Sequence, residues 1–190
     1  LKVPSKATKQ VLVRFGYPDE RVEVVRHGVP PLEGETADKG YVLYVGPKVP
    51  IKGRYIAEQL AREMRQYRFV IVGSFTGRAV RGEPGYVSDE ELERLKRECS
   101  LLLYPSVWLE PCGLVHLETM RYGKVVVGLR MGAVPEYVKH TTVNSVEEMK
   151  LRIEEYMEVP KLREKHGLEN YRHYLEHFTS EKMYERETSF

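Results

Sequence analysis

Four apolar runs of strand length dominate the middle of the chain, and each leads into a loop with glycine or proline. They are YVLYVG, FVIVGS, SLLLYPS and KVVVGL. Helix-length, charged stretches such as RYIAEQLAREMRQY and DEELERLKREC separate them. Strands that are apolar throughout and alternate with helices pair in parallel and are covered on both faces. With right-handed crossovers, the pattern predicts an α/β fold with a doubly wound parallel sheet.

The 190 residues suffice for one domain with a substantial core. We expect residues 1–40 to form a lead-in helix and strand, residues 41–145 the core sheet and its loops, and residues 146–190 a helical C-terminal tail. Two Ser/Glu pairs with capping-box spacing mark helix starts within the last two parts. They are Ser88 with Glu91, and Ser145 with Glu148.

Composition excludes several classes of function. A net charge of +2 is too small to indicate nucleic acid as a partner, and no apolar run has the roughly 18 residues of a transmembrane segment. Cys99 and Cys112 form neither a metal-type pair nor a disulfide framework, so we expect a cytoplasmic protein. Scarce Asn and Gln beside abundant Glu, Lys and Arg suggest a thermophile.

Three loops should meet where a ligand would bind. In doubly wound sheets, ligands lie beyond the carboxyl ends of the strands, at the point where the strand order reverses. The loops expected there span residues 46–53, 73–77 and 105–113. Neither a GxGxxG motif nor a P-loop follows the first strand, so a dinucleotide or P-loop nucleotide site is not supported.

The stretch LEPCGLVHLE places Glu110 and Glu118 on either side of a helix start near Gly113. The unpaired N–H groups and dipole of a helix start attract anions, and glycine lets a phosphate approach the backbone. A carboxylate accepts hydrogen bonds from vicinal sugar hydroxyls. The pattern therefore fits a nucleotide sugar, with Glu110 on the transferred sugar, a diphosphate at the helix start and Glu118 on the ribose.

This stretch resembles the E-x7-E motif of retaining GT-B glycosyltransferases of family 4. Other segments in the matching order resemble further motifs of that family: RHGV, GPKVPIKG, GYVSDEEL, MGAVPEYV and FTSEKMYER. The resemblance runs from about Ser5 to about Glu187. EPCGL and MRYG also resemble segments of glycogen and starch synthases, which are a less close match.

The resemblance implies that the chain is the Rossmann-like, donor-binding C-terminal half of a GT-B enzyme. Such an enzyme transfers a hexose from a UDP-, GDP- or ADP-sugar with retention of configuration and requires neither a metal nor another cofactor. The acceptor site belongs to an N-terminal domain that nothing in this sequence resembles. We therefore expect that domain, or a partner chain, to complete the site, and the isolated chain to be inactive.

The resemblance also assigns roles residue by residue. Lys52 would contact the diphosphate and, with Glu110, form the catalytic pair. The backbone amides of Gly113, Leu114 and Val115 would hold the distal phosphate, while Ser74 and Val87 would line the base pocket. The remaining donor-binding positions are Gly46, Lys48, Pro111 and Cys112, together with Glu118 on the ribose.

Two positions depart from the family pattern. Pro47 stands where the family has a phosphate-binding Arg, and the neighbouring Lys48 would have to replace it without a guanidinium fork. Ala133 replaces the second glycine of the GG-x-PE turn. The loss at Pro47 favours an alternative function, a non-catalytic nucleotide-sugar-binding or assembly module. GT-B epimerases and phosphorylases are further alternatives, but no local pattern supports them.

Three residues beside the motif have open roles. Trp108 either packs the loop or shields a ligand. His116 is interpreted as a histidine on a helix face rather than a catalyst. Cys112 is interpreted as a small packing residue rather than a nucleophile.

Overall fold

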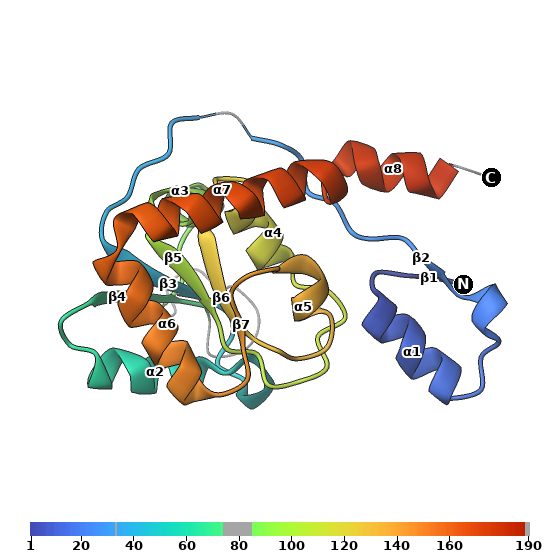
Figure 1. Ribbon diagram of the computed structural model, residues 1–190, viewed down its shortest axis with the longest axis horizontal. Coiled ribbons are helices and arrows are strands. Elements are labelled where there is room, and N and C mark those ends of the chain that lie inside the picture. The colour runs from blue at the N-terminus through green and yellow to red at the C-terminus, as the bar shows by residue number, and fades with distance from the viewer. Residues whose placement is uncertain (33, 74–84, 189–190) are drawn as a thin grey trace.

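The computed structural model describes residues 1–32, 34–73 and 85–188, and it confirms the α/β prediction (Figure 1). Five parallel strands form the main sheet in the order β4-β3-β5-β6-β7. The chain passes from β3 to β4 at one edge and then returns across β3 to β5. The strand order therefore reverses between β3 and β5. The strands are β3 (Tyr41–Val45), β4 (Arg68–Val72), β5 (Leu101–Tyr104), β6 (Val125–Leu129) and β7 (Thr142–Val143).

Helices cover both faces of this sheet, as strands apolar on both sides require. On one face, Leu43 and Val126 pack with residues of α3 (Asp89–Glu98), α4 (Leu114–Met120) and α7 (Pro160–His177). On the other face, strand residues pack with those of α2 (Arg54–Glu63) and α6 (Val146–Glu158). The Ser88 and Ser145 hydroxyls cap α3 and α6, as their spacing predicts.

The first 24 residues form a small unit beside the main sheet (Figure 1). It contains β1 (Lys2–Val3), α1 (Lys6–Arg14), the 3₁₀ turn η1 (Asp19–Arg21) and β2 (Glu23–Val24). The strand predicted within residues 1–40 is thus present in the stretch RVEVV, but it pairs with β1 and not with the main sheet. Glu136, at the end of MGAVPE, joins the two parts by accepting hydrogen bonds from the backbone N–H groups of Lys6 and Ala7, at 2.9 and 2.7 Å.

The C-terminal part is helical, as predicted. After α6 and α7, α8 (Ser180–Thr188) lies beyond the sheet on the side of the N-terminal unit (Figure 1). Two contacts hold this segment there. Val29 and Thr179 form a parallel β-bridge, and the Lys2 ammonium donates a hydrogen bond to the Glu187 carbonyl at 3.0 Å. Within the described ranges, no helix is both long and apolar enough to cross a membrane.

Candidate functional site

The loops after β3 and β5 meet where the strand order reverses, and there they bring Lys52 and Glu110 into contact. Lys52 ends the 3₁₀ turn η2 (Pro50–Lys52), and its Nζ lies 2.9 Å from Glu110 Oε2. The next residue, Gly53, has φ +69°, and a Cβ there would lie 1.9 Å from the Pro105 carbonyl oxygen. Glycine thus allows the close approach that this ion pair requires.

The Glu110 carboxylate is 3% exposed and is held by several donors. Besides Lys52, the Trp108 Nε1–H donates to it at 2.7 Å and the Ser106 hydroxyl at 3.2 Å. Burial raises the pKa of this carboxyl, but hydrogen bonds from Lys52, Trp108 and Tyr104 outweigh it, so the pKa lies below its usual value. Glu110 is therefore a fixed, ionised acceptor at neutral pH.

Trp108 packs the loop, which is one of the two roles that its sequence position left open. Its indole N–H fixes Glu110, and the Lys52 ammonium lies over its ring, 4.9 Å from the centroid. With Leu109 and Pro111, it also lines a cavity of about 430 Å³ on whose other side lies α1.

Helix α4 begins where the sequence predicts, at Leu114 after Gly113. A Cβ on Gly113 would lie 2.4 Å from the Tyr104 hydroxyl and 2.8 Å from the His116 ring, so the position requires glycine. Leu114 is exposed and Val115 half-buried. Burial raises the pKa of the Cys112 thiol to about 11, which agrees with a packing residue and not with a nucleophile.

The MGAVPE turn packs directly against Glu110. The Glu110 carbonyl accepts a hydrogen bond from the Ala133 N–H at 2.7 Å. Gly132 has φ +52°, and a Cβ there would lie 2.4 Å from the Glu110 nitrogen. Ala133 has φ −82°, which any residue adopts. The first glycine of the family's turn is thus required in this chain, whereas alanine fits the second position without strain.

A cavity of about 210 Å³ lies beyond the ends of β3 and β4, beside α3. Gly46, Pro47 and Val87 line it, which brings together three positions that the sequence places at the donor. Ser74, predicted for the same pocket, lies outside the described residues. Lys48 is exposed beside Pro47.

Glu118 makes its ion pair with helix α3. Its Oε2 lies 2.8 Å from Nζ of Lys96, which is 1% exposed and also pairs with Glu93. The sequence does not predict a buried lysine here, because an ammonium in a charged amphipathic helix is usually solvated. Lys96 therefore fixes where the Glu118 carboxylate lies.

Arg54, which the sequence did not single out, joins the start of α2, directly after the first predicted loop, to Gly73 at the start of the second. Its guanidinium donates to the Gly73 carbonyl at 2.8 Å and pairs with Glu58 at 2.9 Å. It thereby fixes the end of β4 against the first turn of α2.

His116 is fully buried on the sheet side of α4. Its ring lies 5.2 Å from the rings of Tyr104 and Tyr137, and within the described chain neither ring nitrogen has a hydrogen-bond partner. Burial lowers its pKa to about 3. A neutral, enclosed imidazole agrees with a helix-face histidine packed on the core and not with a catalyst.

We expect folding stability to fall as the pH drops from 6.5 to about 4.5, because the unfolded chain protonates two histidines that stay neutral when folded. Burial lowers the pKa of His116 to about 3 and that of His173 to about 4. Each histidine contributes up to about 1.4 kcal/mol per pH unit to the slope of the unfolding free energy against pH. Urea unfolding at several pH values should show a smaller slope for His116→Phe and an unchanged slope for the exposed control His27→Gln. An unchanged slope in His116→Phe would contradict this assignment.

Known proteins resemble the chain over most of its length. The uncharacterized glycosyltransferase MJ1607 of Methanocaldococcus jannaschii is 26% identical in an alignment 173 positions long, which covers 74% of this chain and 44% of that protein. Anabaena HepE, in complex with UDP and glucose, superposes with a TM-score of 0.82 at 19% identity, over 97% of this chain and 60% of HepE. This chain thus spans less than two thirds of either protein.

A second structure has the same fold. TarM of S. aureus, in complex with fondaparinux, alpha-GlcNAc-glycerol and UDP, gives a TM-score of 0.77 at 15% identity, over 97% of this chain and 42% of TarM. A family model described as "Glycosyl transferases group 1" matches residues 33–173. By that match, the chain belongs to the group 1 glycosyl transferases.

Proposed function

We propose that this chain is the donor-binding half of a retaining, metal-independent hexosyltransferase of family 4 with UDP-hexose as donor. The observation that carries the proposal is the Lys52–Glu110 contact at 2.9 Å, made by two loops that meet where the strand order reverses. The ammonium has three N–H donors, so it can serve the carboxylate and a diphosphate together. Uracil as the base is supported by HepE and TarM, whose structures contain UDP.

In the proposed mechanism, Glu110 accepts hydrogen bonds from the transferred sugar, and Lys52 stabilises the charge that develops on the leaving diphosphate. The first N–H groups of α4 supply further donors for the distal phosphate. Gly46 and Val87 would contact the nucleotide base, since both line the 210 Å³ cavity. An N-terminal domain or a partner chain would provide the acceptor site, so the isolated chain should bind donor without turnover.

Glu118 is proposed to accept the ribose hydroxyls, with its carboxylate positioned by Lys96. We expect Glu118→Gln to weaken UDP binding about tenfold, since a lost hydroxyl contact of about 1.4 kcal/mol has that effect. Calorimetric titration measures it directly.

The control is Glu93→Gln, which also removes a carboxylate partner of Lys96, together with an ion pair to Arg121, but has no proposed contact with the ligand. Its UDP affinity should stay within about twofold of the parent chain. Equal losses in the two variants would assign the effect to the Lys96 ion pairs and remove Glu118 from the ribose site.

A non-catalytic nucleotide-sugar-binding module is a second candidate, favoured by Pro47, which lines the cavity without a guanidinium. The two candidates differ in turnover by the full-length protein. Slow hydrolysis of UDP-glucose with release of α-glucose, followed by proton NMR, supports the enzyme. Donor binding with no release of sugar, even with the N-terminal half present, supports the module.

A further inference from the structure

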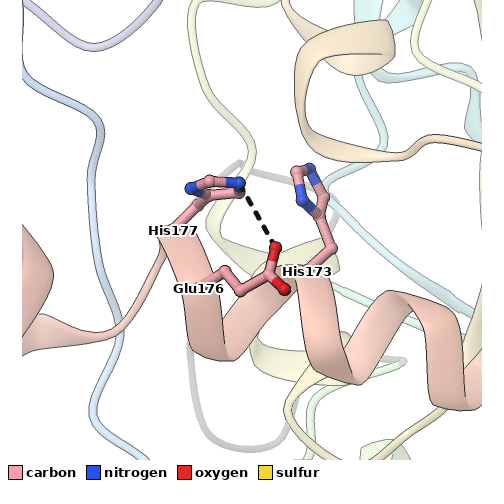
Figure 2. Close-up of side chains that lie close together, drawn as sticks. All are labelled: His173, Glu176 and His177. Atoms are coloured by element: carbon pink, nitrogen blue, oxygen red, sulfur yellow. Dashed lines mark ion pairs between the residues drawn. The ribbon is translucent and has the colours of Figure 1, made fainter.

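The last turn of α7 carries three potential metal ligands on one side of the helix. His173, Glu176 and His177 each offer one ligand atom, and these atoms lie within 4.8 Å of one another. Figure 2 shows the two imidazole rings side by side with the Glu176 carboxylate below and between them. The spacing explains the arrangement, because residues three and four positions apart share a helix face.

His173 has the burial and the vacant ring nitrogens of a ligand. It is 7% exposed, and among the described residues neither ring nitrogen forms a hydrogen bond of normal geometry, although the Glu136 backbone lies close to the ring. Its ring lies 4.8 Å from that of His177 and 5.0 Å from that of Phe178. A buried imidazole with no partner loses hydrogen bonds to water without replacement. Coordination of a metal ion would supply the missing partner.

Histidine binds metals through a nitrogen of its neutral imidazole ring. Glu176 Oε2 lies 3.6 Å from Nε2 of His177. Two imidazoles and a carboxylate form a three-ligand set that zinc accepts, with water completing a tetrahedron.

Charges from other elements act on the site in both directions. His177 is the last residue of α7, where the helix dipole favours a cation. Arg26, Lys139 and Arg186 place positive charge near one or both rings and oppose a divalent ion.

We propose that His173, Glu176 and His177 bind a zinc-class divalent cation at the C-terminal end of α7. This site is separate from Lys52 and Glu110, and the proposal does not depend on how the donor binds. Figure 2 shows all three ligands on the last turn, next to the connection to α8. Bound zinc would hold both rings in one arrangement and stabilise the folded chain by linkage.

The test is calorimetric titration of the tag-free chain with Zn²⁺, combined with thermal unfolding with and without the ion. We expect one equivalent to bind and the unfolding midpoint to rise. In His177→Gln and Glu176→Gln, both on the more exposed side of the cluster, the dissociation constant should rise at least tenfold and the midpoint shift should disappear. Since neither side chain is buried, both variants should fold.

The control is His140→Gln, because His140 belongs to a different histidine group, 3.5 Å from Glu169 and stacked on His166. Its zinc affinity and midpoint shift should match those of the parent chain. The proposal is overturned if the parent chain shows no saturable binding at 100-fold excess Zn²⁺. It is also overturned if His177→Gln binds zinc as tightly as the parent, or if His140→Gln is the variant that loses it.

Discussion

Gly53→Ala is expected to destabilise the folded chain by about 2–5 kcal/mol. Gly53 has φ +69°, where a side chain costs about 1–2 kcal/mol. The added Cβ would also lie 1.9 Å from the Pro105 carbonyl oxygen, so the loops after β3 and β5 would have to separate, at about 1–3 kcal/mol more. Urea unfolding followed by circular dichroism measures the sum.

Gly40→Ala separates the two contributions. Gly40 has nearly the same φ, +68°, but beyond its chain neighbours no atom of the described residues lies within 4 Å of the point that a Cβ would occupy. This control should lose only about 1–2 kcal/mol. Equal losses at the two positions would show that close packing of the loops at Gly53 adds nothing to stability.

The second large effect is expected from Glu110→Gln, which keeps the volume of a buried side chain and removes its charge. Charge-assisted hydrogen bonds contribute about 1.5–3 kcal/mol each, so UDP-glucose should bind roughly 10- to 150-fold more weakly. UDP has no hexose for Glu110 to contact. Its affinity should therefore stay within about threefold of that of the parent chain.

The comparison of the two ligands in the same variant is the internal control. A loss confined to UDP-glucose places the carboxylate at the sugar. An equal loss of UDP binding would instead indicate that Glu110 acts by holding Lys52, whose Nζ lies 2.9 Å away. Thermal unfolding of the variant would reveal whether the exchange of a buried charge has disturbed the fold.

The sheet was predictable because its strands are apolar on both faces, a pattern that solvent-facing strands do not show. Because parallel strands end at the same edge of a sheet, the loops after them were also expected to converge. These loops bring Lys52 into contact with Glu110. The short strands β1 and β7 have two residues each, too few for any hydrophobic period to register. The pairing of RVEVV with β1 depends on contacts far apart in sequence.

Parts of the candidate site depend on burial that a local pattern cannot reveal. Lys96 belongs to a charged helix, yet it is enclosed between the carboxylates of Glu93 and Glu118. That the Trp108 indole donates a hydrogen bond to Glu110 can be recognised only from the folded geometry of the loop. Similarly, the need for glycine at Gly132 comes from the Glu110 backbone, 22 residues away in the chain.

The most direct test of the donor site is calorimetric titration of this chain with UDP, GDP and ADP in a chelating buffer without metal. We expect saturable binding of UDP that exceeds binding of GDP and ADP, because the remaining hydrogen-bond donors of the site compensate for the arginine that Pro47 replaces. Binding of GDP or ADP in place of UDP would keep the site and correct the base. No binding of any of the three at millimolar concentration would contradict the account that Lys52, Glu110 and Glu118 form a donor site in this chain.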